Sequence, residues 1–147
     1  MKDTGPFDTS DASLPLAQAL VPQGDGWTVT PRNVRGTAAG GWFSTPRDML
    51  RFVRGLQAGR SVPAPVLADM VSSKTAGLDG EDWGYGFMLD RQGNVLSYGH
   101  GGIAPGVNAE IRFYPSLDTT LIVFSNQDNG AYDDLRKNAA RLITGER

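Results

Sequence analysis

The stretch from Tyr98 to Asn126, which reads YGHGGIAPGVNAEIRFYPSLDTTLIVFSN, decides the fold of this chain. From Val107 to Phe113 apolar and polar residues alternate, which indicates a strand with one buried face. The run Leu121–Phe124 (LIVF) is apolar without alternation, as expected of a strand covered on both faces. Between them, Pro115–Asp118 (PSLD) favours a turn. We therefore predict an antiparallel hairpin whose second strand is central in its sheet.

Immediately before this hairpin lies the only histidine, His100, within the run Gly99-His100-Gly101-Gly102. We expect a strand over 94–99. His100 follows the end of this strand and is predicted to lie in a glycine-rich turn. An earlier strand is predicted over 83–89 (WGYGFML), with a turn at 91–94 between the two. The pattern thus predicts an antiparallel sheet of three to four strands.

The clearest helix is predicted over residues 44–58. Thr45 can cap it, Pro46 suits the first helical position, and Asp48 falls in the first turn, where the helix dipole favours negative charge. Apolar residues recur at helical spacing and predict one buried face, made of Met49, Phe52, Val53 and Leu56. A shorter helix is predicted over 65–72. A last helix follows Asp128-Asn129-Gly130, and its predicted shared face is Tyr132, Leu135, Ala139, Leu142 and Ile143.

These elements describe a single α+β domain over residues 1–147. Residues 1–43 contain many glycines and prolines and are predicted to be mostly irregular. A small helical portion spans 44–82, and the antiparallel sheet with the C-terminal helix spans 83–147.

Several of these segments resemble the serine β-lactamase-like hydrolases, which include class C β-lactamases, DD-peptidases and related esterases. His100-Gly101-Gly102 resembles the family's Lys-Thr-Gly or His-x-Gly triplet, and Ser125-Asn126 its closing Ser-Asn or Ala-Asn pair. Residues 39–52 (AGGWFSTPRDMLRF) look like the family's "AGG-x-x-ST-x-x-DM-x-RF" segment. Met1–Gly5 resembles a stretch internal to the family. The resemblance covers essentially the whole chain and matches only the second half of the family, so it implies the C-terminal portion of the β-lactamase/transpeptidase-like fold.

The resemblance also implies one wall of a hydrolase site. His100 would polarise the substrate carboxylate or the catalytic tyrosine, and Gly101 and Gly102 would let the substrate backbone approach closely. The backbone N–H of Ile103 would form half of an oxyanion hole, and Asn126 would lie near a polar group of the substrate.

The family's acylation machinery has no counterpart in the sequence. A serine nucleophile followed one helical turn later by lysine is required, together with a Tyr-x-Asn unit. None of the three lysines has a serine three positions before it, and none of the four tyrosines has an asparagine two positions after it. We therefore expect no catalytic residue in the chain itself.

Two other interpretations of His100 remain open. A histidine in a glycine-rich turn can simply satisfy local backbone carbonyls. Alternatively, Ser44 or Ser97 could pair with His100 and an aspartate in an unrelated triad, although Ser44 is better placed to cap a helix. The acidic residues of the loop 77–82 lack calcium-loop spacing, so we predict no metal site there.

Composition narrows the remaining possibilities. The 14 basic and 16 acidic residues form no basic stripe, so no nucleic-acid partner is expected. Without cysteine there is no disulfide or thiol nucleophile, and a single histidine argues against a zinc site. We predict no cofactor. No signal-peptide core or membrane-length apolar run is visible, so we expect a soluble chain with no membrane partner and leave its compartment open.

Two functions from different classes follow from these observations. In one, the chain is half of a hydrolase site and acts on ester, amide or β-lactam bonds only when a complementing N-terminal half supplies the nucleophile. In the other, it is a non-catalytic remnant that folds and self-associates, as a homo-oligomer, without turnover.

Overall fold

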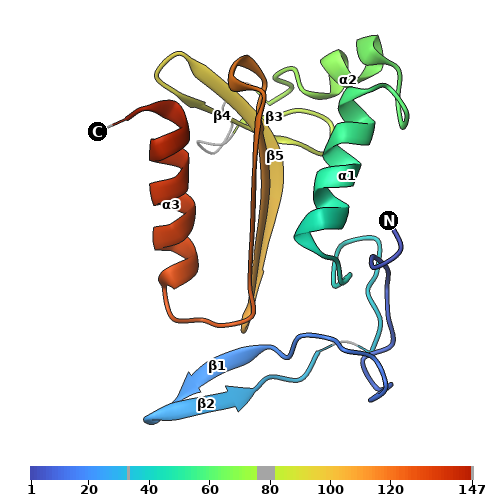
Figure 1. Cartoon of the computed structure of the whole chain (residues 1–147), viewed down its shortest axis with the longest axis vertical. Helices are drawn as coiled ribbons and strands as arrows, with labels where there is room; N and C mark the ends of the chain where they lie inside the picture. The colour runs from blue at the N-terminus through green and yellow to red at the C-terminus, as the bar shows by residue number, and fades with distance from the viewer. Residues whose placement is uncertain (33, 76–81, 147) are drawn as a thin grey trace.

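The computed structural model describes residues 1–32, 34–75 and 82–146. Its centre is a five-stranded antiparallel sheet in which neighbours along the chain are also neighbours in space. The strands are β3 (Asp82–Trp83), β4 (Met88–Gln92), β5 (Val95–Ala104), β6 (Val107–Tyr114) and β7 (Thr119–Ser125). The helix α1 (Pro46–Gln57) covers one face and α3 (Ala131–Thr144) covers the other (Figure 1). The architecture is α+β as predicted, with one strand more in this sheet than the predicted maximum of four.

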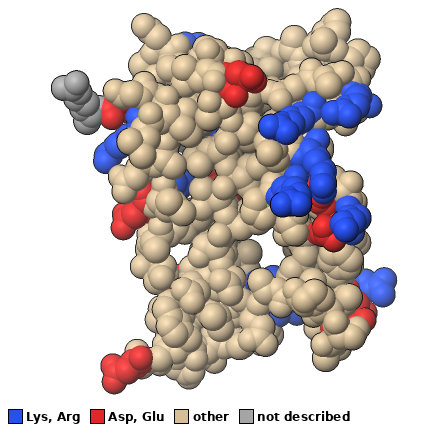
Figure 2. All heavy atoms as spheres, in the orientation of Figure 1, with Lys and Arg blue, Asp and Glu red and all other residues tan. Residues whose placement is uncertain are grey.

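The helix α1 begins where its capping sequence predicted. The Thr45 hydroxyl accepts a hydrogen bond from the Asp48 N–H at 3.2 Å, and Val53 and Leu56 are buried against the sheet side. Phe52, predicted to share that face, is 39% exposed. Three arginines of α1 point outward, and Figure 2 shows basic side chains gathered where Figure 1 draws this helix. The shorter helix α2 (Ala64–Met70) follows α1.

The helix α3 buries a narrower face than predicted. Tyr132 and Ala140 are buried, but Leu135 is 58% exposed and Leu142 is 85% exposed, so the prediction that these two leucines share the buried face is wrong. They lie seven residues apart and therefore follow one another along a single side of the helix, beside the buried stripe. Among the described residues, no helix has the length and apolar character needed to cross a bilayer.

The N-terminal segment is anchored to α1 through a buried carboxylate. Asp48 is fully buried and accepts hydrogen bonds from the Asp3 N–H at 2.9 Å and the Thr4 hydroxyl at 3.0 Å. Burial opposes ionisation of Asp48, but these hydrogen bonds and one from Arg51 outweigh it and lower the pKa of the carboxyl below its usual value. Further along, β1 (Leu20–Gln23) and β2 (Gly26–Val29) form a two-stranded hairpin within the segment predicted to be mostly irregular.

Three strand predictions are corrected by the structure. The stretch 83–89 is not one strand, because the chain turns between β3 and β4, where Gly86 has a φ of 76° and a side chain on Gly84 would overlap the Met70 carbonyl oxygen. The strand predicted to end at Gly99 continues to Ala104 as β5, because β6 pairs with it along that whole length, so His100 lies within a strand and not on a turn. The strand β7 contacts both α1 and α3 but is a border strand of the five, not a central one.

The two faces of the sheet are built differently. Towards α1 lies an aromatic cluster of Tyr98, Phe113 and Val53. Towards α3 lie the polar residues of β6, which the alternation had assigned to the exposed face. Glu110 and Arg112 are instead buried and paired at 2.6 Å. The Tyr132 hydroxyl of α3 donates to Glu110 at 3.4 Å.

Candidate functional site

The strand β5 has two halves with different neighbours. From Val95 to Gly99 it is paired with β4 on one side, and the last pair is Met88 with Gly99. Beyond Gly99 only β6 remains as a described partner, up to Ala104. The run His100–Ala104 therefore has one strand edge to which no described strand is bonded. An edge of this kind can pair with an extended ligand.

The direction of the backbone groups on this edge follows from the hairpin turn. Pro105 and Gly106 form a two-residue turn, which makes Ala104 and Val107 the closing pair. Antiparallel pairs alternate between hydrogen-bonded and non-bonded, so the backbone groups of Ile103 and Gly101 point away from β6. The turn between β4 and β5, closed by Gln92 and Val95, leads to the same assignment when counted from the other side. The Ile103 N–H thus faces the unpaired edge, and its part in an oxyanion hole stays a prediction.

The glycines of β5 differ in the space that the surrounding chain leaves for a side chain. A side chain on Gly99 would overlap the Ile111 carbonyl oxygen, so this position is fixed by strand packing. A Cβ on Gly101 would lie 3.1 Å from the Ala109 carbonyl oxygen and 3.4 Å from the Glu110 carboxylate. Gly102 has open space around it, so packing within the described chain does not explain why it is a glycine. A close approach by substrate to the edge would explain it.

His100 is exposed, so it is not a core histidine. Its Nδ1 lies 2.7 Å from the Gly101 carbonyl oxygen. A carbonyl oxygen can only accept, so Nδ1 is the donor in this contact and Nε2 takes no part in it. This contact is also the local one that the simpler interpretation of a glycine-flanked histidine expected. It nevertheless presents Nε2, the group that could exchange a proton with a substrate or a second catalytic residue.

His100 has an aromatic neighbour, Trp83, that the sequence analysis did not connect with it. The Trp83 ring lies edge-on to the imidazole with 5.5 Å between centroids, which restricts the orientation of the histidine. Nearby in sequence, Tyr85 is 59% exposed and carries the Lys74 ammonium 4.9 Å above its ring. In the sequence these two aromatic residues alternate with glycines as WGYG.

Asn126 is separated from His100. It follows β7, and its side-chain amide donates to the Gln18 carbonyl at 2.9 Å. The strand β6 lies between β7 and β5, so two strand spacings, about 10 Å, separate the ends of β5 and β7. The described residues bring together His100, Gly101, Gly102 and Ile103 as one edge and place Asn126 across the sheet, where it holds the N-terminal segment.

Asp128 stabilises the turn that follows the last residue of this edge, Ala104. The Asp128 carboxylate accepts hydrogen bonds from the Gly106 N–H at 2.7 Å and from the Asn108 side-chain amide at 3.0 Å. A Cβ on Gly106, where φ is 70°, would lie 2.5 Å from the Leu20 nitrogen. The turn after β5 is therefore packed between the N-terminal segment and the segment that follows β7.

Neither serine of the alternative triad reaches His100. The Ser44 hydroxyl lies 2.8 Å from the Thr4 hydroxyl, at the start of α1. Ser97 is buried on the opposite face of β5, where the Arg112 guanidinium donates to its hydroxyl at 3.5 Å. The geometry thus offers no Ser-His pair.

The acidic loop lies outside the described residues apart from Asp82, which belongs to β3 and accepts a hydrogen bond from Ser73 at 2.6 Å. Within residues 1–32, 34–75 and 82–146, no three potential metal-ligating side chains gather at one place.

Comparison with known proteins places this chain in a family. The model of the beta-lactamase family matches residues 1–146. Comparison with curated protein sequences finds no match. Among solved structures, a penicillin binding protein from Bacillus halodurans is similar with a TM-score of 0.80 and 25% identity, over 93% of this chain and 44% of that one.

A D-amino acid amidase from Ochrobactrum anthropi SV3, in complex with D-phenylalanine, is similar with a TM-score of 0.68 and 25% identity, over 99% of this chain and 49% of that one. A D-stereospecific amidohydrolase from Streptomyces sp. shares the fold, with a TM-score of 0.63 and 24% identity over 86% of this chain and 40% of that one. The chain thus spans less than half the length of each of these structures. Because the family match extends over nearly every residue, this chain belongs to the beta-lactamase family.

Proposed function

We propose that this chain supplies the His-Gly-Gly wall of a serine-hydrolase site, and that ester, amide or β-lactam hydrolysis requires a complementing N-terminal half that brings Ser-x-x-Lys and Tyr-x-Asn. The observation that carries the proposal is the unpaired edge of β5 from His100 to Ala104, with an exposed imidazole beside it. In this role the edge aligns the substrate backbone, the Ile103 N–H stabilises the developing oxyanion, and Nε2 of His100 faces the reacting groups.

The test combines the purified chain with a polypeptide carrying the two missing motifs. The first source is the coding region preceding the Met1 codon, if it encodes an in-frame Ser-x-x-Lys. The second is the corresponding half of the Bacillus halodurans penicillin binding protein. The readouts are p-nitrophenyl butyrate and chromogenic cephalosporin turnover, and labelling by a fluorophosphonate probe.

We expect no turnover by the chain alone and measurable turnover by the pair, lowered about 100-fold or more by His100→Ala. Gln57→Ala, at the end of α1, is a matched control that should leave turnover unchanged. Stoichiometric labelling of a serine in the isolated chain, abolished when that serine is replaced by alanine, would contradict the proposal.

The alternative is a non-catalytic chain that self-associates. It is favoured by the exposed Leu135 and Leu142 on α3 and by the border position of β7, which no described strand pairs on its outer side. The N-terminal segment reaches only the residues after β7, where the Leu20 N–H donates to the Asn126 carbonyl at 2.9 Å. An apolar helix side beside an open strand edge is a surface on which a second copy can pack.

Light scattering over a wide concentration range shows whether the chain self-associates or stays a monomer. We expect association that the double substitution Leu135→Gln/Leu142→Gln weakens. Leu117→Gln, at a 41% exposed leucine in the turn before β7, serves as the control and should leave it unchanged. A monomer at every concentration, with the amides of β7 strongly protected from hydrogen exchange, would show that the chain covers its own edge.

A further inference from the structure

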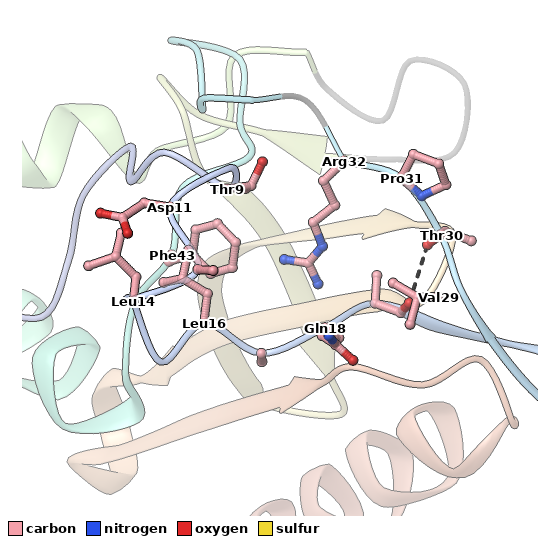
Figure 3. Close-up of a pocket in the computed structure, with 13 residues that line it drawn as sticks. Thr9, Asp11, Leu14, Leu16, Gln18, Val29, Thr30, Pro31, Arg32 and Phe43 are labelled. Carbon is pink, nitrogen blue, oxygen red and sulfur yellow. Dashed lines mark hydrogen bonds between the residues drawn. The ribbon is translucent and has the colours of Figure 1, made fainter.

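A pocket of about 430 Å³ lies in the N-terminal segment, away from the edge of β5. Its walls are the irregular chain before β1, the segment after β2, and Phe43. Figure 3 shows the Arg32 side chain reaching from the segment after β2 into this space. None of the residues of the proposed wall lines it.

Arg32 is a charged residue of this pocket with no charge partner among the described residues. No described residue forms a hydrogen bond or ion pair with its guanidinium, and its Nε is buried without an acceptor. The guanidinium lies over the Phe43 ring, whose centroid is 5.0 Å from Cζ. Burial lowers the pKa of Arg32, although arginine stays charged at any physiological pH. Arg32 is partly buried, and its buried Nε has no acceptor, so an anion from outside the chain that accepts from Nε would be bound favourably.

The charges around the pocket favour one negative charge on that anion. The other charged lining residue is Asp11, which Figure 3 places at the opposite end of the pocket from Arg32. Its carboxylate is already engaged by the Ser13 N–H at 2.9 Å and the Ser13 hydroxyl at 2.6 Å. No lysine or second arginine is among the lining residues. The pocket therefore offers one positive charge, on Arg32, and one distant negative charge, on Asp11. This balance suits an anion with a single negative charge better than a doubly charged phosphate.

The rest of the lining favours an apolar body behind the charge. Leu14, Leu16, Val29 and Phe43 are the larger apolar side chains among the residues that line the pocket. A carboxylate matches the planar fork of arginine with two parallel hydrogen bonds, and Nε is one of the donors that a side-on approach uses. The pocket is also held in place from outside. Gln18 is fixed by Asn126, and the Thr30 hydroxyl donates to the Pro105 carbonyl at 3.0 Å.

We infer that this pocket binds a small monocarboxylate with an apolar body, its carboxylate on the Arg32 guanidinium and its body against the leucines and Phe43. The inference does not depend on the proposed hydrolase role, because the pocket shares no residue with the β5 edge. It names a ligand-binding site in the half of the family's fold that carries no nucleophile motif.

The test measures binding of 4-fluorophenylacetate and of its neutral isostere, 4-fluorophenylacetamide, to the unmodified chain by ¹⁹F NMR titration. We expect the acid to bind about tenfold or more tightly than the amide, as one charge-assisted pair implies. Arg32→Gln should remove this preference. Arg35→Gln, which changes an arginine three residues away that is 70% exposed and outside the pocket, should keep it.

The inference is overturned if acid and amide bind equally, if Arg32→Gln keeps the preference, or if inorganic phosphate competes as well as the acid does. If Arg32→Gln fails to fold, the acid–amide comparison on the unmodified chain still decides, and Leu16→Trp provides a second variant. Filling the pocket in this way should abolish binding of the acid and leave Arg32 in place.

Discussion

The α1 face and the α3 face of the five-stranded sheet cover the same strands with different chemistry. On the α1 face, Tyr98 packs edge-on against Phe113 with 5.4 Å between ring centroids, and Val53 of α1 closes the cluster. On the α3 face, Glu110 and Arg112 form a buried ion pair that Tyr132 and Arg136 extend into the helix. One face is held by apolar burial, and the other by a network in which each polar group depends on its partners.

The difference also separates the stable part of β5 from the proposed site. Tyr98 and His100 point to the same face of this strand, two residues apart. Tyr98 lies under α1 and is buried, whereas His100 lies past the last residue that β4 pairs and is exposed. The aromatic core ends where the proposed wall begins, so the site can be altered without disturbing the core.

The largest expected effect comes from breaking the polar face. Glu110→Ala leaves the buried Arg112 guanidinium without its carboxylate, which should lower the free energy of unfolding by about 3–5 kcal/mol. Phe113→Ala, on the apolar face, should cost a similar amount, about 3–5 kcal/mol, through the cavity it leaves. Urea unfolding followed by circular dichroism measures both.

A paired substitution separates the two kinds of stabilisation. Glu110→Leu/Arg112→Met removes both charges at once, and replacing a buried pair by apolar residues is often neutral. We expect this double variant to recover most of the stability that Glu110→Ala loses. A double variant as unstable as the single one would show that the polar face is held by specific hydrogen bonds and not only by charge balance.

A smaller effect is expected from alkaline pH, again on the polar face alone. Burial, followed by the nearby Glu110 carboxylate, raises the pKa of Tyr132 from 10.0 to about 12. Because the folded pKa is the higher one, this contribution to stability is complete below pH 10 and is lost as the pH rises from 10 towards 12. The loss is at most about 2–3 kcal/mol.

The measurement is urea unfolding between pH 9 and about 12 for the unmodified chain and for Tyr132→Phe, which removes only the ionisable hydroxyl. We expect a shallower loss of stability in the variant. Equal slopes would assign the alkaline transition to other groups, such as Tyr98 or Tyr114, whose pKa values burial also raises.

Local sequence patterns predicted where helices and strands occur better than they predicted which faces those elements bury and which strands neighbour one another. The helix start at Thr45-Pro46 and the strand β6 were predicted because capping and alternation are local signals. Alternation could not tell which face is covered, and α3 buries Glu110 and Arg112 on the side predicted to be exposed. The apolar sequence of β7 indicated two covered faces but not its border position, because strand order depends on which other strands are present.

The proposed site was predictable to a similar degree. The motif and its glycines predict a wall from His100 to Ile103, and that role stays a prediction. The glycine-rich run also predicts a turn, which is wrong because long-range pairing with β6 makes it a strand. The contact of Trp83 with His100 and the buried Nε of Arg32 depend on residues far apart in sequence, and no spacing rule indicates them.

The smallest expected effect is that of His100→Ala on stability. The side chain is exposed, makes one hydrogen bond to a neighbouring carbonyl, and touches Trp83 only at the edge of its ring. Its removal should change the free energy of unfolding by less than about 0.5 kcal/mol, whereas Tyr98→Ala, on the same face of the same strand, should cost about 3–5 kcal/mol.

Because the sequence contains one histidine, modification of histidine by diethylpyrocarbonate reports on this ring alone, and we expect rapid modification of the folded chain with no loss of its circular dichroism signal. Protection of His100 until the chain unfolds, or a loss for His100→Ala comparable to that for Tyr98→Ala, would make it a structural residue of the α1 face and would remove the main support for a site at this edge.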